Sequence, residues 1–149
     1  MSIYNSIKTK KIVIASDHAG FDLKESIKKF LKKKRKKILD LGTKNKNSVD
    51  YPDYAHLLCK KIKKKSNQIG ILVCGSGAGM NMSANRHSYI RAALCYNIKS
   101  TKLSREHNNA NVMAIGARLT NKKVALKCVN TFINTSFKGG RHKRRVKKI

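Results

Sequence analysis

Residues 68–79, QIGILVCGSGAG, decide the fold: an apolar run that ends at Cys74 passes directly into a glycine-rich turn. A near-continuous apolar run of this length is typical of a strand covered on both faces, as in a parallel sheet. Residues 11–16, KIVIAS, have the same character. The sequence predicts three further strands, at Lys37–Leu41, Ile90–Leu94 and Asn111–Ile115.

Helix-type stretches separate these strands. Apolar residues recur at helical spacing between Leu23 and Leu31, and a second apolar stripe follows Pro52. Strand–helix alternation predicts one three-layer α/β/α domain with a five-stranded parallel sheet over residues 1–149. Residues 1–10 form a short extension in this scheme, and the basic tail over 139–149 lies outside the last helix. Three more helices are expected over Ala78–Arg86, Ser100–Asn108 and Lys122–Asn134.

Positive charge dominates the composition, with 35 Lys and Arg against 7 Asp and Glu and a formal net charge of +28. Such an excess is compatible with binding to nucleic acid or to an anionic membrane. Three runs hold much of it, Lys28–Lys37, Lys60–Lys65 and Arg141–Lys148, and the first two are expected on the polar faces of helices. Lysine outnumbers arginine, and the chain has no Trp and only 6% aromatic residues, so we favour compositional drift. We therefore expect no specific nucleic acid and no membrane as partners.

The cysteines indicate a reducing compartment. None of the four forms a CxxC pair, and no cluster of Cys and His has the spacing of zinc ligands. The N-terminus lacks the apolar stretch of a signal peptide, and no run approaches the ~18 apolar residues of a membrane span. The sequence thus predicts free thiols, no metal site and a cytoplasmic location.

Polar or glycine-rich segments follow three of the five strands, at the sheet edge where ligands bind in parallel α/β folds. His107 and Asn108 come near the end of a predicted helix, and Arg141 and Arg145 lie in the basic tail. We expect all of these groups to converge on one rim of the sheet. The residues that follow the strands are Asp17, His18, Gly75, Ser76, Gly77, Ala78, Gly79 and Arg118.

The turn over residues 75–79 favours an anion. Its glycines allow a close approach to the backbone, and several N–H groups, with the positive end of a helix dipole, face whatever binds there. The spacing matches neither GxGxxG nor the P-loop, so neither a dinucleotide nor a nucleoside triphosphate is favoured. A thiol before such a turn can act as a base or nucleophile, although Cys74 alone is more simply a buried strand end.

The other polar residues have alternatives of the same kind. His107 is either a general acid–base group or an ordinary surface residue. The pair Asp17-His18 either binds hydroxyls or phosphate or simply caps a helix. Arg141 and Arg145, four positions apart, either present two guanidinium groups to one phosphate or form a solvated basic end.

Together these motifs resemble the ribose-5-phosphate isomerase B family, which includes galactose-6-phosphate isomerase subunits. The resemblance runs from about residue 11 to the C-terminus and implies a Rossmann-like fold. It implies interconversion of ribose 5-phosphate and ribulose 5-phosphate, in the non-oxidative pentose phosphate pathway, without metal or organic cofactor. It also implies a homodimer, or a dimer of dimers, with sites at the subunit interface. The matching segments are SDHAGFDLK, DYPDYA, GILVCGSGAGM, IRAAL, LSREHNNANVMAIGAR and GGRHKRRV.

The resemblance also implies a role for each candidate residue. Cys74 matches the base that moves a proton between C1 and C2, and His107 matches the acid that opens the sugar ring. Ser76 supplies an assisting hydroxyl, and the N–H groups of residues 75–79 hold the enediolate oxyanion. Asp17 and Asn108 match contacts to sugar oxygens. The phosphate contacts implied are His18, Arg141, Arg145 and, in addition, Arg118.

Two positions refine the match. Met80 stands where another branch of the family has a Glu base, which places this chain in the Cys branch. Asn109 stands where relatives usually have Asp, and it would weaken any influence of that acid on His107. A six-carbon substrate, allose or galactose 6-phosphate, stays open, as does a catalytically inactive relative.

Overall fold

A computed structural model describes residues 11–62, 64 and 67–149, so the expected extension over residues 1–10 lies outside the described residues. Five parallel strands form one sheet with the order β2-β1-β3-β5-β4. The predicted five-stranded parallel sheet is therefore confirmed. The strands are β1 (Lys11–Ser16), β2 (Ile38–Asp40), β3 (Gln68–Cys74), β4 (Ala92–Leu94) and β5 (Val112–Gly116).

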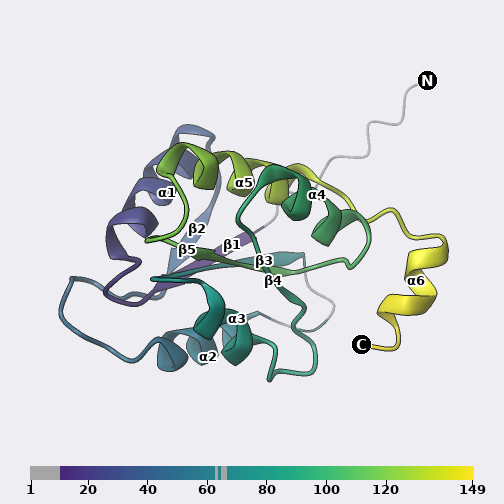
Figure 1. Ribbon diagram of the computed structural model, residues 1–149, viewed down its shortest axis with the longest axis horizontal. Coiled ribbons are helices and arrows are strands. Elements are labelled where there is room, and N and C mark those ends of the chain that lie inside the picture. The colour runs from purple at the N-terminus through teal and green to yellow at the C-terminus, as the bar shows by residue number, and fades with distance from the viewer. Residues whose placement is uncertain (1–10, 63, 65–66) are drawn as a thin grey trace.

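Helices cover both faces of the sheet and produce the three layers visible in Figure 1. One face carries α1 (Phe21–Lys33), α4 (Ile98–Glu106) and α5 (Lys122–Asn134). The other face carries α2 (Tyr51–Lys61) and α3 (Ala78–Ala84), whereas a short α6 (Arg141–Val146) stands apart from both layers. Within the described ranges, none of these helices is long and apolar enough to cross a bilayer.

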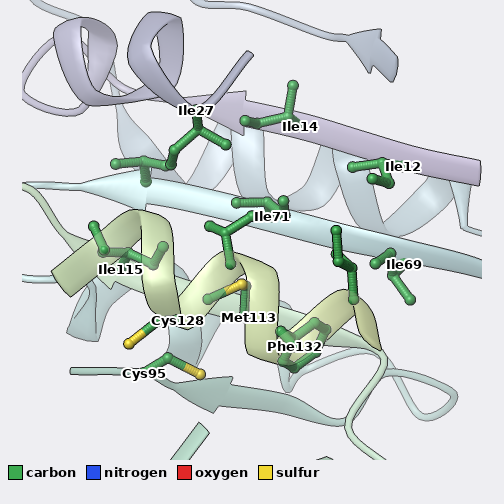
Figure 2. Close-up of a cluster of buried hydrophobic side chains, with 14 of the residues drawn as sticks. Ile12, Ile14, Ile27, Ile69, Ile71, Cys95, Met113, Ile115, Cys128 and Phe132 are labelled. Atoms are coloured by element: carbon green, nitrogen blue, oxygen red, sulfur yellow. The ribbon is translucent and has the colours of Figure 1, made fainter. Parts of the chain in front are cut away.

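Alternate residues of the central strands face opposite helical layers. In β1, Ile12 and Ile14 pack into the cluster beneath α1 and α5, whereas Val13 and Ala15 pack into the cluster above α2 and α3. Figure 2 shows the first cluster, with Phe132 of α5 among the side chains that meet the strands. Because both faces are buried, the strands show no polar alternation, which explains the continuous apolar runs in the sequence.

The missing side chain at Gly70 lets α2 approach β3 closely. A Cβ at this position would lie 2.6 Å from Leu58 Cδ2 and 2.8 Å from Ile62 Cδ1. Gly70 pairs with Val112 at the beginning of β5, so this contact lies toward the amino end of the sheet.

A buried lysine joins α1 to β2. Lys24 is only 1% exposed, and its Nζ donates to the Asp40 carboxylate at 2.7 Å. Lys28 reaches the same carboxylate at 2.6 Å, and both lysines contact Glu25. Although partial burial acts to raise the pKa of Asp40, hydrogen bonds from Lys24 and Lys28 hold it below its ordinary value. The two elements are thus tied by charge as well as by packing.

The largest difference from the predicted elements is α6, an additional helix that forms within the tail placed after the last predicted helix. Its sequence, RHKRRV, has no apolar stripe, and none of its residues is buried, so hydrophobic periodicity gave no signal. Boundaries also shift: β2 and β4 have only three residues each, and α3 ends at Ala84. Helix α2 ends at Lys61, so the run Lys60–Lys65 continues beyond it, and Lys63 and Lys65 lie outside the described residues.

Candidate functional site

A pocket of about 320 Å³ opens at the carboxyl ends of the central strands. The ends of β1, β3 and β5 and the beginnings of α2 and α3 surround it. This is the position at which parallel sheets bind ligands, and most of the predicted residues that follow the strands line the pocket, although His18, Gly77 and Ala78 do not. The lining residues are Asp17, Tyr51, Cys74, Gly75, Ser76, Gly79, Arg118 and Leu119.

Cys74 ends β3 with its thiol turned into the loop that follows. The residue is 4% exposed, and the N–H of Gly77 donates to its Sγ at 3.2 Å. Gly77 has φ = +79° at the beginning of α3, a conformation that L side chains rarely adopt. The N–H of Ala78 donates to Ser76 Oγ at 3.3 Å. The loop therefore turns back on itself and directs backbone donors to the Cys74 sulfur and the Ser76 hydroxyl.

Two glycines on neighbouring chain segments leave room for this loop. A Cβ on Gly116, at the end of β5, would lie 2.5 Å from the carbonyl oxygen of Ser76. A Cβ on Gly20 would lie 2.2 Å from the carbonyl oxygen of Val73. Ordinary carbon contacts begin near 3.4 Å, so both positions require glycine. Backbone packing, rather than side chains, thus fixes the path from Val73 to Ser76.

Asp17 and His18 are positioned by the turn after β1. Asp17 is 6% exposed, and its Oδ1 accepts a hydrogen bond from the N–H of Gly20 at 2.9 Å. His18 Nδ1 accepts from the N–H of Val49 at 3.2 Å, so a neutral ring carries its proton on Nε2. The carboxylate lines the pocket, whereas the imidazole is held beside it by the loop that leads to α2.

Arg118 covers the loop from the β5 side. Its N–H donates to the carbonyl oxygen of Gly75 at 3.0 Å. Its guanidinium lies against the same glycine, because a Cβ built there would be 3.3 Å from Arg118 Nη1. A cation is therefore available beside the backbone donors of residues 75–79.

Tyr51 is a pocket residue that sequence reasoning missed. It begins α2, is 42% exposed, and its ring would meet a Cβ on Gly79 at 2.6 Å. The matched segment DYPDYA contains it, so the only available signal was the motif itself rather than any chemistry of an isolated tyrosine.

The second group of candidates lies at the opposite end of the sheet. Helix α4 runs back from the carboxyl edge, and His107 directly follows its last residue. Gly70 pairs with Val112 and Cys74 with Gly116, so the first residue of β5 is already about 13 Å from the level of Cys74. His107 precedes that residue. The prediction that all groups converge on one rim of the sheet is therefore wrong within one chain.

The tail residues join His107 at this far end. The imidazole rings of His107 and His142 stack with centroids 4.2 Å apart and planes at 11°. Partial burial, and then the positive charges of His107, Arg141, Arg145 and Lys138, lower the pKa of His142. Figure 1 shows α6, which carries both arginines, beyond the amino ends of the strands. His107, Asn108, Arg141 and Arg145 thus form a second cluster, separate from Cys74.

The backbone next to His107 is irregular. Asn109 has φ = +48°, in the left-handed region that Asn tolerates better than most residues. Its carbonyl oxygen accepts from Arg91 Nε at 2.9 Å. Within the described residues, the Asn109 side chain makes no hydrogen bond to His107. The backbone conformation suits Asp as well as Asn, so it does not explain the difference from the family pattern at this position.

The remaining three thiols are buried in the core. Cys59, Cys95 and Cys128 are each at most 1% exposed. Burial raises the pKa of Cys59 to about 12 and that of Cys95 to about 11. In the part of the chain that the structure describes, no three His, Cys, Asp or Glu side chains gather as metal ligands. Cys74 is set apart from the other cysteines by its position on a pocket.

Comparison with known proteins identifies the group to which these features belong. The family model for ribose/galactose isomerase matches residues 12–149. Ribose-5-phosphate isomerase B of Escherichia coli is 37% identical over 140 residues, which is 94% of this chain and 94% of that protein. A ribose 5-phosphate isomerase from Thermotoga maritima superposes with a TM-score of 0.90 at 47% identity, covering 93% of this chain and 96% of that one.

A further solved structure carries a ligand. It is ribose-5-phosphate isomerase B from Mycoplasma genitalium with bound ribulose-5-phosphate, with a TM-score of 0.89 at 42% identity. The match covers 94% of this chain and 93% of that chain. The family model, the Escherichia coli protein and the solved structures all match this chain over nearly its whole length. The chain therefore belongs to the ribose/galactose isomerase family.

Proposed function

We propose that this protein interconverts ribose 5-phosphate and ribulose 5-phosphate, with Cys74 as the catalytic base. The observation that carries the proposal is the thiol of Cys74 on a pocket of about 320 Å³, next to a glycine loop whose backbone donors face it. That pocket lies at the carboxyl edge of the sheet, and one of the solved structures similar to this chain is an isomerase with bound ribulose-5-phosphate.

The reaction needs one proton to move between two neighbouring carbons. The Cys74 thiolate removes the proton from C2 of the open-chain aldose, and the C1 carbonyl becomes an enediolate oxygen. Backbone N–H groups of residues 75–79 and the Arg118 guanidinium stabilise that negative charge, which exists only during the reaction. The thiol then returns a proton to C1, while the proton of the O2 hydroxyl moves to O1. The C2 carbonyl of the ketose results without any change in overall oxidation state.

His107, Asn108, Arg141 and Arg145 contribute from a second copy of the chain. The two clusters lie at opposite ends of one sheet, so one protomer cannot bring the ring-opening acid and the phosphate clamp to its own Cys74. A two-fold dimer would place the carboxyl edge of each subunit against the amino edge of the other. Apolar side chains on α3 and after β4 support such an interface: Met82 is 69% exposed and Tyr96 is 61% exposed. The assembly is a homodimer or a dimer of dimers.

A cytoplasmic location fits the same picture. All four cysteines are free, as is usual in a reducing compartment. The catalytic role of Cys74 itself depends on a thiol that stays reduced. We propose that neither nucleic acid nor a membrane is a specific partner of this protein.

Two experiments test the reaction and the shared site. A coupled assay for ribulose 5-phosphate, run with EDTA and with a panel of five- and six-carbon sugar phosphates, should show the highest kcat/KM for ribose 5-phosphate. Cys74→Ala should abolish turnover while phosphate still binds. A Cys74→Ala enzyme with full activity would remove Cys74 from the mechanism, and a clear preference for a six-carbon sugar would change the substrate.

Mixing two inactive variants tests the dimer. Cys74→Ala and His107→Ala subunits, refolded together at equal amounts, should recover about a quarter of wild-type activity, because half the dimers are mixed and one site in each is intact. If each chain held a complete site, every site would carry one of the two substitutions. The mixture would then stay inactive, and the shared-site proposal would be wrong.

A further inference from the structure

The end of α4 contacts the C-terminal segment at three successive positions. Arg105 Nε donates to the carbonyl oxygen of Thr135 at 3.1 Å. The carbonyl oxygen of Glu106 accepts from the N–H of Lys138 at 3.1 Å, and its carboxylate meets Lys138 Nζ at the same distance. His107 then stacks on His142. Successive residues at the end of α4 thus contact residues that lie progressively farther along the C-terminal segment, from Thr135 to His142.

These contacts matter because α6 has no buried residue of its own. It follows Gly139 and Gly140, both at positive φ, and a Cβ built at either glycine would meet nothing within 4 Å. Val146 and Ile149 line a cavity of about 550 Å³ together with Tyr89 and Arg91. The contacts with the end of α4 therefore help to set the direction in which α6 begins.

Glu106 supplies the ion pair that joins α4 to the C-terminal segment. It is 13% exposed, whereas Lys138 is 58% exposed, so the carboxylate is the sheltered partner. The hydrogen bond from Lys138 is the main reason that the pKa of Glu106 lies below its ordinary value. Lys102 approaches the same carboxylate at 3.8 Å, but it belongs to α4 itself and ties nothing to the tail.

We propose that Glu106 and Lys138 are positioning residues for the phosphate-binding arginines. Their ion pair fixes the segment between α5 and α6 to the end of α4, next to His107. Arg141 and Arg145 are thereby carried at a set distance from the ring-opening histidine, and both groups reach the partner's pocket as one unit. The inference rests on the proposed function, because it assigns the arginines to the substrate phosphate.

Lys138→Met and Lys102→Met form a matched pair of variants. Each removes one positive charge that approaches Glu106, so the net charge of the protein falls by the same amount in both variants. Only the first removes a side-chain contact between α4 and the C-terminal segment, because the backbone bond from Lys138 to Glu106 remains in both variants. We expect Lys138→Met to raise KM for ribose 5-phosphate by roughly three- to fivefold with kcat nearly unchanged, as expected for an exposed ion pair acting on uniform substrate binding. Lys102→Met should stay close to wild type, and Lys138→Arg should restore the KM.

Amide hydrogen exchange supplies a readout that does not depend on turnover. Exchange over residues 139–149 should be faster in Lys138→Met than in wild type, and unchanged in Lys102→Met and Lys138→Arg. Equal KM values for the two methionine variants, or equal exchange in all four proteins, would overturn the proposal. If wild type does not isomerise ribose 5-phosphate, the proposed function fails, whereas the exchange comparison still decides whether the ion pair holds the tail.

Discussion

Replacing Gly116 with alanine places a methyl group against the backbone of the loop that carries Cys74. The new Cβ would lie 2.5 Å from the carbonyl oxygen and 2.6 Å from the carbonyl carbon of Ser76. Ordinary contacts begin near 3.4 Å, so the loop or the end of β5 must move by about 0.9 Å, the difference between 3.4 and 2.5 Å. Neither group is the flexible end of a side chain, so the strain cannot be relieved by a rotamer change.

Two magnitudes follow for Gly116→Ala. Overpacking of this kind costs about 1–3 kcal/mol, and we expect a value near the upper end because backbone meets backbone. A displacement near 1 Å of the groups that position the reacting atoms lowers kcat about 100-fold. Urea unfolding followed by circular dichroism measures the first quantity, and the coupled isomerase assay under saturating substrate measures the second.

Gly70→Ala is the matched control. It too forces a methyl group into close contact, at 2.6 Å, but against Leu58 and toward the amino end of β3. It should lower the free energy of unfolding while leaving kcat near the wild-type value. A Gly116→Ala protein that is as active as Gly70→Ala would refute the idea that this close approach shapes the catalytic loop.

Three further predictions concern other parts of the molecule. Asp40→Asn should lower the free energy of unfolding by about 2 kcal/mol at neutral pH, because it leaves buried Lys24 with Glu25 alone. Folding lowers the pKa of Asp40, so its contribution to the free energy of unfolding is complete above pH 3.8 and disappears as the pH falls through the pKa of the folded state. Urea titrations at several pH values should therefore show a smaller loss of stability in acid for the variant than for wild type. Iodoacetamide should modify Cys74 before the other thiols and inactivate in step, with peptide mass spectrometry as the measurement; early labelling of Cys59 or Cys95 would contradict it. Burial, and then the charges of His56 and Lys60, lower the pKa of His87, so stability should fall as the pH drops below 6.5, and His87→Asn should flatten that dependence in thermal melts; an unchanged slope would count against it.

The carboxyl-edge half of the site was predictable because local sequence determines it. A strand that ends at Cys74 and a glycine turn that starts at Gly75 can only lie at the carboxyl edge, and the same holds for Asp17 after β1. Apolar runs in β1 and β3 fixed the layers for the same reason. The three-residue strands β2 and β4 were harder to delimit, because so short an element carries little pattern.

The amino-edge half was misplaced although the predicted parallel topology already determined its position. A helix that connects two parallel strands returns to the amino end of the next strand, so His107, which follows α4 and precedes β5, must lie at the amino edge. Helix α6 is built from charged residues without a buried face, so its formation leaves no trace in apolar spacing. Tyr51 reaches the pocket only because Gly79 lets its ring approach, a contact between segments far apart in the chain.

The ion pair between Glu106 and Lys138 has a consequence at the level of composition. Glu106 is the only acidic residue among residues 54–149, whereas basic residues continue to accumulate through that region. A lysine in this region therefore has no other acidic side chain nearby in sequence with which to pair. Loss of Glu106 would leave the C-terminal two thirds of the protein with no acidic side chain at all.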